Sequence, residues 1–326
     1  MKETINMKAL VTGATGFIGS HLTEALLKKG FAVTCLVRST SNLKYLEDLN
    51  VRTVQGDCSR LESLYEAVEG VDYVFHLAGL TKACSEADFS VANGQGTANI
   101  LKAVLEKNAG IKRFVHVSSL AAVGPSSNGV PLREDCAALP VSFYGRSKLE
   151  GEQLVLKHRE DIPVVVIRPP AVYGPRDRDM LVFFRLVKAG IAPVWGECHY
   201  SFIYIEDLIH GILLSALDEN AGGEIFFMSD GVIYSSDDII NAIADAVQKR
   251  PVKLKIPRFI LSVAGLISER SGKASIINAD KIRELKHLNW VCDMSKAAKR
   301  LKFEPQVKIK EGARWTFDWY RIHQWL

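Results

Sequence analysis

The sequence has few cysteines, and they form none of the patterns that indicate a disulfide framework or a metal centre. Six cysteines are spread over 326 residues, with no C-x-x-C pair and no spacing typical of metal ligands. The first six residues are polar, which is not the pattern of a secretory signal peptide. We therefore expect reduced cysteines, no bound metal and a cytoplasmic protein.

Long apolar runs and runs of one charge are also missing. The most apolar stretch in the second half, 259–267, is too short to span a bilayer, and it fits a buried helix better than one that touches a membrane. The net charge is only +4, and no basic run alternates with aromatic residues. We therefore expect neither a membrane nor a nucleic acid as partner, but a globular chain with one large or two smaller domains.

What the sequence does contain is a glycine-rich stretch near its start. Residues 8–12 have the length and apolar character of a buried strand, glycines follow at 13, 16 and 19, and a helical pattern begins at once. Glycine permits positive φ and close backbone approach, and a helix N-terminus offers free N–H groups to a pyrophosphate. The G-x-x-G-x-x-G spacing is one residue longer at its first gap than the usual dinucleotide fingerprint. We expect this loop to bind a dinucleotide through Gly13, Thr15, Gly16, Phe17, Ile18 and Gly19.

Strand and helix patterns alternate after this loop. Further strands are predicted over 32–37, 52–55, 73–77 and 113–117, with helical spacing between them. Such alternation implies parallel strands joined by right-handed crossovers, and hence an α/β fold with a doubly wound parallel sheet. Ligands bind at the carboxyl ends of the strands in such a sheet.

The end of the second predicted strand bears on the choice of cofactor. Arg38 stands there, and positions 32–44 contain no acidic residue. Arginine suits the 2′-phosphate of NADP, whereas a carboxylate suits the free ribose of NAD. The sequence therefore favours NADP, although a solvated surface arginine is the alternative interpretation of Arg38.

Two further strand ends offer residues to the same cofactor. Asp57 and Cys58 follow the third predicted strand, and Ala78 and Gly79 follow the fourth. A carboxylate there can accept a hydrogen bond from the adenine amine, and small residues leave room for a ribose. Asp57 is also interpretable as a helix cap.

A tyrosine and a lysine four residues apart open a later predicted helix. Tyr144 and Lys148 share one face of it. A free tyrosine has a pKa of about 10, and a nearby ammonium group favours the phenolate and lowers this pKa toward the range of efficient acid–base catalysis. Ser118 and Ser119 end the preceding strand, where a hydroxyl group can hold a substrate oxygen and stabilise developing charge.

Together these motifs resemble the extended short-chain dehydrogenase/reductase family, the NAD(P)-dependent epimerase/dehydratase group, over nearly the whole chain. The matching segments are 12–19 (TGATGFIG), 56–57 (GD), 76–79 (HLAG), 117–119 (VSS), 144–148 (YGRSK), 168–175 (RPPAVYGP) and 202–207 (FIYIED). The resemblance implies that Tyr144 is the acid–base residue and that Lys148 is its partner and a ribose ligand. It also implies that Ser119 holds the substrate hydroxyl, since the family's serine lies five residues before a glycine, here Gly124.

The resemblance further implies two domains and a dimer. We expect residues 1–175, with returning segments near 200–230, to form the NAD(P)-binding Rossmann domain, and residues 176–199 and 231–326 to form mainly a smaller, discontinuous substrate domain. Helices of this part are predicted over 180–189, 236–247 and 311–323. Many relatives dimerise through two helices per subunit, here those that begin near Asn93 and Tyr144, so a homodimer is expected.

Departures from the family's patterns narrow the chemistry. Leu120 and Ala121 stand where sugar-nucleotide 4,6-dehydratases carry an Asp-Glu pair, so dehydration is not expected. Many nucleotide-sugar epimerases hold the pyrophosphate of their substrate with two arginines. Residues 199–201 (HYS) occupy the position of one, and only Arg283 is a candidate for the other.

Three functions remain open at this point. The first is an NAD(P)-dependent oxidoreductase or epimerase that transfers a hydride at a secondary alcohol or ketone of a sugar or nucleotide-sugar-like substrate. Segment 118–125 (SSLAAVGP) also resembles that of hydroxysteroid dehydrogenases and dihydroflavonol-type reductases, so the alternative is an NADP-dependent ketoreductase for bulkier, less charged small molecules. The third is a dinucleotide sensor without activity, but such relatives generally lose the tyrosine or the lysine, and both are present here.

Overall fold

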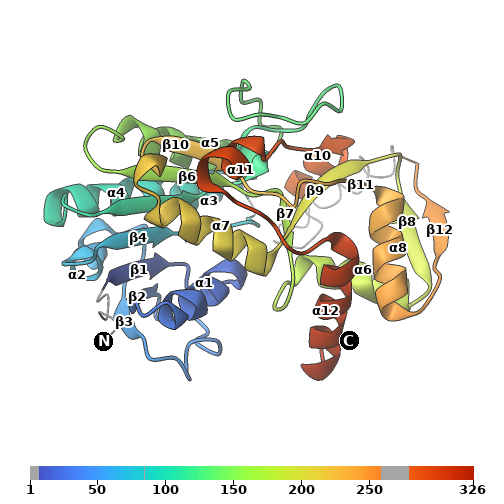
Figure 1. Ribbon diagram of the computed structural model, residues 1–326, viewed down its shortest axis with the longest axis horizontal. Coiled ribbons are helices and arrows are strands. Elements are labelled where there is room, and N and C mark those ends of the chain that lie inside the picture. Colours follow the sequence, from blue (N-terminus) through green and yellow to red (C-terminus); the bar gives the residue numbers. More distant parts are fainter. Residues whose placement is uncertain (1–6, 84, 258–278) are drawn as a thin grey trace. The chain divides into compact units, whose positions relative to one another are not determined.

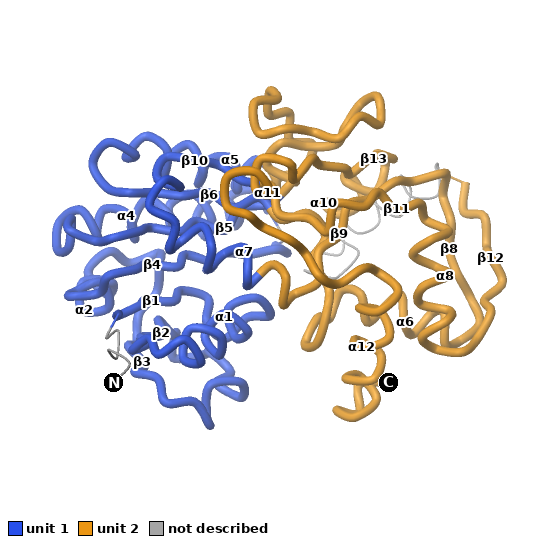
Figure 2. Tube along the Cα trace, viewed as in Figure 1, with its two compact units in different colours: residues 1–119, 146–168, 209–226 blue, residues 120–145, 169–208, 227–326 orange. Residues whose placement is uncertain are grey.

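The computed structural model describes residues 7–83, 85–257 and 279–326. The apolar stretch 259–267 lies outside the described residues. The chain divides into two compact units, shown in Figure 2: unit 1 comprises residues 1–119, 146–168 and 209–226, and unit 2 comprises residues 120–145, 169–208 and 227–326.

The division into compact units differs from the predicted domain boundaries. Segments 120–145, 169–175 and 200–208, which we expected in the cofactor-binding domain, belong to unit 2. The compact units are defined by contacts within the chain, whereas the predicted domains are defined by the ligand that each would bind. The assignment of cofactor binding and substrate binding to two domains stays a prediction.

A seven-stranded sheet forms the centre of unit 1 (Figure 1), in the order β10-β6-β5-β4-β1-β2-β3. Its strands are β1 (Lys8–Thr12), β2 (Ala32–Val37), β3 (Arg52–Gln55), β4 (Tyr73–His76), β5 (Arg113–Val117), β6 (Val164–Arg168) and β10 (Glu224–Phe227). The neighbouring pairs from β3 to β6 run parallel. This order reverses direction between β1 and β4, which is the switch point where dinucleotides bind in such sheets.

Helices cover both faces of this sheet. They are α1 (Phe17–Lys28), α2 (Tyr65–Val68), α3 (Glu86–Phe89), α4 (Gly96–Lys107), α5 (Phe143–Lys157) and α7 (Ile205–Leu217), and a π-helical segment, Ser90–Gln95, leads into α4. Helices α5 and α7 each begin in unit 2 and continue in unit 1. The doubly wound α/β fold predicted from the alternating pattern is therefore confirmed.

The core of unit 1 explains why α2, α4 and α5 share one face of the sheet. Their apolar residues, including Ile100, Val104 and Val155, form one buried cluster with residues of the strands, including Leu10 and Val164. Successive side chains along a strand point to opposite faces of the sheet, so only alternate residues of each strand meet these helices. The buried residues of α1 and α7 do not belong to this cluster, and these two helices lie on the other face (Figure 1).

The described residues of unit 2 form two small sheets. Its strands are β7 (Ala171–Tyr173), β8 (Ile191–Val194), β9 (His199–Tyr204), β11 (Ile233–Ser235), β12 (Val252–Lys255) and β13 (Asn289–Trp290). Strand β9 is central in the first sheet, since β7 and β13 pair with it in parallel and β11 pairs with it antiparallel. Strands β8 and β12 form the second sheet as a parallel pair.

The helices in the described part of unit 2 are α6 (Asp179–Lys188), α8 (Ser236–Val247), α10 (Ala279–Leu285), α11 (Ser295–Leu301) and α12 (Ile309–Ile322). Two of them, α6 and α12, pack against each other through aromatic residues. Phe184 of α6 stacks on Phe317 of α12 with ring centroids 6.3 Å apart, and its ring meets that of Tyr320 edge-on at 5.4 Å. Aromatic pairs in these geometries add to the free energy gained by burial alone.

Most predicted elements agree with the structure to within two residues. The strands over 32–37, 52–55 and 113–117 and the helix over 236–247 have the predicted bounds. The predicted strand 73–77 ends one residue earlier, at His76, and the helix expected around 93–105 consists of the π-helical segment followed by α4.

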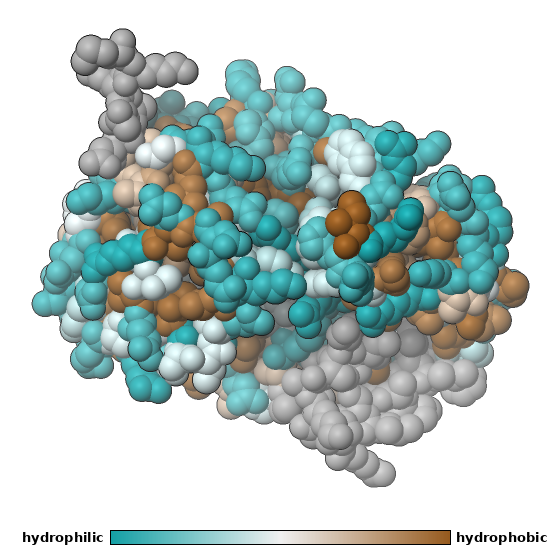
Figure 3. Space-filling model, turned by 90° about the horizontal axis from the view of Figure 1, so that it is seen from below, coloured by the Kyte–Doolittle hydropathy of each residue, from teal (hydrophilic) through white to brown (hydrophobic). Residues whose placement is uncertain are grey.

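The described surface is mainly hydrophilic on the face drawn in Figure 3, with smaller hydrophobic groups among the polar residues. Within the described ranges, no helix has both the length and the apolar character that crossing a membrane requires. The five cysteines in these ranges are free thiols.

Candidate active site

The glycine-rich loop has the geometry that its sequence predicts. Gly13 follows β1 with φ at +73°, and a Cβ there would lie 2.8 Å from the backbone nitrogen of Ala78. A Cβ on Gly19 would lie 2.1 Å from the carbonyl oxygen of Gly13, so only glycine allows α1 to approach the loop this closely. No side chain of the described residues caps α1, and its first turn has no acidic residue. The loop therefore fits the pyrophosphate of a dinucleotide.

The ends of β2 and β3 bring Arg38, Asp57 and Cys58 together. Asp57 accepts hydrogen bonds from the backbone N–H (2.9 Å) and the hydroxyl group (2.8 Å) of Ser59. The backbone bond from Ser59 is the main cause that lowers the pKa of Asp57, and the charge of Arg38 contributes. Asp57 therefore stabilises the loop after β3 and does not cap a helix. Burial raises the pKa of the Cys58 thiol to about 12, so this thiol is not ionised near neutral pH.

Ala78 and Gly79 lie at the switch point, in the segment that follows β4. A Cβ on Gly79 would lie 2.7 Å from Oδ1 of Asn93 and 4.0 Å from Nζ of Lys148. Asn93, in the π-helical segment, accepts from the backbone N–H of Leu80 (2.7 Å) and donates to its carbonyl oxygen (3.0 Å). Its amide group also donates to Oγ of Ser147 (2.8 Å). Asn93 thus ties the loop that follows β4 to α5.

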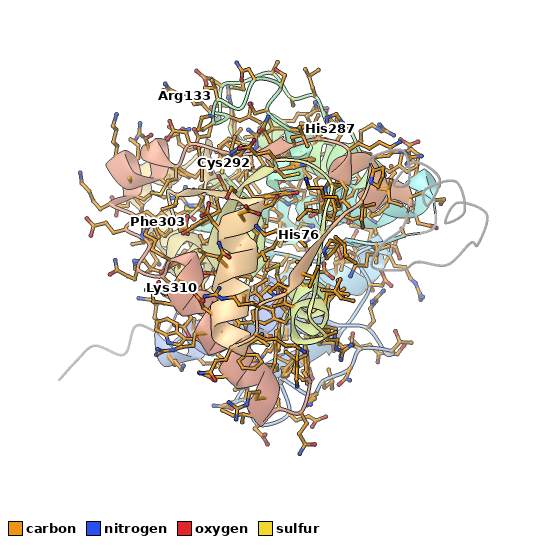
Figure 4. The ribbon with its side chains drawn as sticks, turned by 90° about the vertical axis from the view of Figure 1, so that its right-hand side faces the viewer. His76, Arg133, His287, Cys292, Phe303 and Lys310 are labelled. Atoms are coloured by element: carbon orange, nitrogen blue, oxygen red, sulfur yellow. The ribbon has the colours of Figure 1, made fainter. Side chains whose placement is uncertain are left out.

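A chain of hydrogen bonds connects Thr12, the last residue of β1, to Asn93. The backbone N–H of Ala78 donates to Oγ1 of Thr12, which lies 2.8 Å from Nδ1 of His76. Nε2 of His76 lies 3.0 Å from Oγ1 of Thr97, which in turn donates to the carbonyl oxygen of Asn93. Since the hydroxyl proton of Thr97 is committed to Asn93, Nε2 of His76 donates to Thr97, and Nδ1 accepts from the hydroxyl group of Thr12. Burial, together with a smaller contribution from the charge of Lys148, lowers the pKa of His76 (labelled in Figure 4) to about 3, so its ring is neutral.

Lys148 is buried, with only 6% of its surface exposed. Its ammonium group donates to the carbonyl oxygen of Val117, the last residue of β5, at 2.7 Å. Burial lowers the pKa of Lys148 to about 8, while the negative charge of Glu152, one turn later on α5, opposes this shift. The lysine therefore still carries most of its positive charge at neutral pH.

Glu152 of α5 and Arg168, the last residue of β6, form a buried ion pair. Their side chains are 1% and 6% exposed, and Nη2 of Arg168 lies 2.6 Å from Oε2 of Glu152. Nε of the same arginine donates at 3.1 Å to the carboxylate. The hydroxyl group of Ser118 donates to Glu152 as well. A buried charge pair with further hydrogen bonds fixes its members in one geometry.

The two serines at the end of β5 differ in their surroundings. Ser118 is 4% exposed and its hydroxyl group is committed to Glu152, whereas Ser119 is only partly buried. Leu120 and Ala121, which follow, are both buried apolar residues. Ser119 is therefore the serine of the pair whose surroundings suit contact with a substrate.

Tyr144 lies in the first turn of α5, within unit 2. Its backbone N–H and that of Phe143 donate to the two carboxylate oxygens of Asp280, at 3.0 and 2.7 Å. The N–H of the next residue, Gly145, donates to Oγ of Ser142 at 3.0 Å. Side chains thus satisfy three of the four N–H groups that the start of a helix leaves without an intrahelical acceptor.

The arginine considered for pyrophosphate binding is engaged inside unit 2. Nη1 of Arg283 donates to Asp280 at 3.2 Å, and its guanidinium group lies 4.1 Å from the ring centroid of Phe143. On β9, Ser201 is 2% exposed and its hydroxyl group accepts from the backbone N–H of Cys292 at 3.1 Å. Ser201 therefore does not take the place of the second arginine.

The structure groups most of the predicted site residues at the carboxyl ends of parallel strands. Sequence reasoning missed Asn93 as a contact of Gly79, the buried Glu152 and the carboxylate of Asp280. Glu152 lies four residues after Lys148, so its helical spacing was available as a signal. Neither of the other two has a local signal, because their partners lie far away in the sequence.

Comparison with known proteins agrees with this architecture. Residues 9–228 match the family described as the NAD dependent epimerase/dehydratase family. The ceramide reductase of Caulobacter vibrioides is 29% identical over 97% of this chain and 95% of its own length. A Bacillus subtilis protein described as an uncharacterized UDP-glucose epimerase is 31% identical over 94% of this chain and 95% of its own length. The UDP-glucuronic acid 4-epimerase of Bacillus cereus, solved with UDP-glucuronic acid and NAD, superposes with a TM-score of 0.78 and 27% identity, covering 97% of this chain and 100% of that one.

The chain therefore belongs to the NAD dependent epimerase/dehydratase family, as its motifs predicted. It is an NAD(P)-dependent enzyme of the oxidoreductase and epimerase type that acts on a small molecule.

Proposed function

We propose that the protein is an NADP-dependent ketoreductase, or dehydrogenase in the reverse direction, whose substrate carries its secondary alcohol or ketone on a group without a nucleotide diphosphate. The observation that carries this proposal is the engagement of Arg283 with Asp280 and Phe143. A diphosphate needs cationic donors directed at its oxygens. The other arginine expected for such a substrate is replaced by 199–201 (HYS).

Three residues divide the work on the substrate. Tyr144 donates a proton to the carbonyl oxygen during reduction and removes it from the alcohol during oxidation. Lys148, one helical turn later on α5, would supply a positive charge of the kind that favours a phenolate beside it. Ser119 donates a hydrogen bond to the same substrate oxygen and stabilises its developing charge.

The cofactor loop, with Gly13, Gly16 and Gly19, would hold the pyrophosphate, and Lys148 would bond the nicotinamide ribose. The bound nicotinamide supplies or accepts the hydride. Arg38 is exposed at the end of β2, and its charge reaches Asp57. That position suits a 2′-phosphate, which supports a preference for NADP.

A relative supports the substrate class. The ceramide reductase matches almost the whole chain, and its name describes an apolar substrate without a nucleotide. A buried apolar pair, Leu120 and Ala121, follows the proposed serine ligand, where an enzyme for water elimination needs acid–base groups.

Nucleotide-sugar epimerisation is the second candidate. It is favoured by the likeness to the UDP-glucuronic acid 4-epimerase, which covers both chains almost fully. In that reaction the same tyrosine, lysine and serine would act, but the keto intermediate would stay bound and be reduced from its other face.

One experiment separates the two candidates. Freshly purified protein is denatured, any released nucleotide is identified, and NADPH and NADH are titrated into the native protein. NADPH oxidation is then followed with a long-chain acylamino ketone and a 3-ketosteroid, and sugar products are analysed after incubation with UDP-glucose and UDP-glucuronic acid. Reversible NADPH binding with ketone turnover supports the reductase, whereas tightly retained NAD with conversion of a UDP-sugar supports the epimerase and contradicts the role given to Arg38.

We also propose that the protein acts in the cytoplasm as a homodimer that pairs through α4 and α5. Size-exclusion chromatography with light scattering tests this, because a dimer has twice the chain mass of 36.1 kDa. A mass of one chain at micromolar concentration would contradict the dimer.

A further inference from the structure

The first turn of α5 is capped by a carboxylate from a distant helix. Asp280 lies in α10, 136 residues after Tyr144, yet its two oxygens accept from consecutive backbone N–H groups of α5. Helix caps usually come from the residue that precedes the helix. Ser142 has that position, and its hydroxyl group accepts from the backbone N–H of Gly145.

A second acidic residue of α10 holds the local cap in turn. Oγ of Ser142 donates to Oε1 of Glu284 at 2.8 Å, so this hydroxyl group has one fixed orientation. Asp280 and Glu284 are 7% and 8% exposed. Two carboxylates of one short helix therefore contact the start of α5 over three successive residues, 142–144.

The charges around these carboxylates are balanced within α10 and α5. Arg283 pairs with Asp280 at 3.2 Å and Lys281 pairs with Glu284 at 2.8 Å. The N-terminal end of a long helix carries a partial positive charge that also favours a carboxylate. The buried carboxylates of Asp280 and Glu284 therefore each have a charged partner, as buried charged groups require.

We propose that Asp280 is a positioning residue for Tyr144, which it holds in the orientation for proton transfer by fixing the backbone of the first turn of α5. The phenol of Tyr144 is attached to this turn, so fraying of the turn moves the phenol relative to its substrate. A displacement of about 1 Å in a catalytic group can cost about 100-fold in rate. Glu284 supports the same turn through Ser142. This inference rests on the catalytic role proposed above for Tyr144.

A matched control exists in the same unit. Asp207 is 5% exposed and accepts from two consecutive backbone N–H groups, those of Gln306 (3.0 Å) and Val307 (2.9 Å), about 100 residues away in the sequence. Asp207→Ala removes the same kind of contact as Asp280→Ala, but from a segment that carries none of the proposed catalytic residues.

The test compares kcat and KM of these variants at a temperature where each is fully folded, with NADPH and a ketone that the wild type reduces. Asp280→Ala is expected to lower kcat at least tenfold with KM for NADPH changed less than twofold, and to raise the solvent deuterium isotope effect on kcat because proton transfer becomes slower. Asp280→Asn, which keeps one acceptor oxygen, is expected to lie between this variant and the wild type. Asp207→Ala is expected to keep kcat within twofold.

Hydrogen–deuterium exchange of a peptide that covers 141–150 gives a readout independent of turnover. Exchange at residues 143–145 should accelerate at least tenfold in Asp280→Ala and stay unchanged in Asp207→Ala. If the wild type reduces none of the ketones, the proposed function fails. Hydrogen–deuterium exchange at residues 143–145 then tests by itself whether Asp280 fixes the first turn of α5. Unchanged exchange, an unchanged kcat in Asp280→Ala, or an equal loss of kcat in Asp207→Ala would overturn the positioning role.

Discussion

The two ends of helix α5 are held in different ways, although the helix carries both of the residues proposed to handle the proton. In unit 1, Lys148 bonds to Val117 of the neighbouring strand, and Glu152 is part of a buried ion pair. In unit 2, the first turn with Tyr144 depends on Asp280, which comes from the far end of the chain. One end is thus held by the βα units next to it in the sequence, and the other by a helix more than 130 residues later.

The contacts at one end of α5 are expected to stabilise the fold, whereas the residue at the other end is proposed to transfer the proton. The ion pair in unit 1 is buried and joins α5 to β6, so its loss should affect folding first. Tyr144 as a residue is only partly buried, so we expect that its hydroxyl group can be removed with little effect on folding. Substitutions at the two ends of α5 should therefore change different measured quantities.

The largest effect is expected at the end of α5 that carries the chemistry. Tyr144→Phe removes the proposed acid–base group and should lower kcat about 10²–10⁴-fold, which is the usual contribution of general acid–base catalysis. Its thermal midpoint should stay within about 2 °C of the wild type, because the aromatic ring and its packing remain. Steady-state kinetics and a thermal melt measure both quantities.

Tyr65→Phe is the matched control for this variant. The hydroxyl group of Tyr65 donates to Glu106 at 2.7 Å on the exposed side of unit 1, so kcat should not change. If Tyr144→Phe keeps full activity while Tyr65→Phe does too, Tyr144 has no catalytic role, and the distinction between the two ends of α5 loses its basis.

The second prediction concerns the end of α5 in unit 1. Glu152→Gln leaves Arg168 buried beside a neutral amide, and breaking a buried ion pair in this way costs about 3–5 kcal/mol of unfolding free energy. Chemical denaturation followed by circular dichroism measures this loss. At temperatures where the variant is folded, it should retain more activity than Tyr144→Phe.

An exposed ion pair in the same unit provides the control for Glu152→Gln. Arg52 and Glu66 approach to 2.6 Å, but their side chains are 59% and 69% exposed. Glu66→Gln should therefore cost less than about 1 kcal/mol. Equal losses for the two variants would mean that the buried pair does not stabilise α5 as inferred.

The same comparison explains how much the sequence could predict. Strands β1 to β5 of unit 1 and the spacing of Gly13, Gly16 and Gly19 are encoded by local periodicity and by the residue type each turn requires, and these predictions agree with the structure. Local patterns also identify Tyr144 and Lys148, because a fixed helical spacing brings them to one face. Unit 1 is therefore largely predictable from short stretches of sequence.

Contacts between distant stretches were not predictable in this way. Asp280 lies in a short helix of ordinary composition, and nothing near it in the sequence indicates that it caps α5. Asn93 lies in a π-helical segment, and its side chain bonds to Leu80 and Ser147, which are 13 and 54 residues away in the sequence. The grouping of 120–145 with the later chain in unit 2 also rests on distant contacts, such as the backbone bonds of Ser126 to Asn289 and of Leu132 to Val291, and the predicted domain boundary at 175 stays a prediction.

A third prediction tests the close packing of the cofactor loop in unit 1. Gly19→Ala places a Cβ about 2.1 Å from the carbonyl oxygen of Gly13, so α1 or the loop must shift. Overpacking of this kind costs about 1–3 kcal/mol, and we expect NADPH to bind about tenfold more weakly or worse in a fluorescence titration. Gly110→Ala is the control, because a Cβ there meets no atom within 4 Å. A variant of Gly19 with unchanged affinity would show that the loop does not depend on this contact.

The smallest effect is expected at Arg38, which lies at the exposed end of β2 in unit 1, far along the sequence from α5. Arg38→Asp removes a cation suited to a 2′-phosphate and introduces a carboxylate suited to a free ribose, so the ratio of affinities for NADPH and NADH should fall about tenfold, equal to about 1.4 kcal/mol. Arg159→Asp makes the same change in charge beside Glu160 in the turn after α5 and should leave the ratio unchanged. Isothermal titrations with both cofactors measure this ratio of affinities.

If the ratio stays constant in Arg38→Asp, the arginine is a solvated surface residue and the cofactor preference must reside elsewhere in unit 1. A tenfold change without any loss of stability would instead show that this edge of the site selects the cofactor independently of the contacts that hold α5.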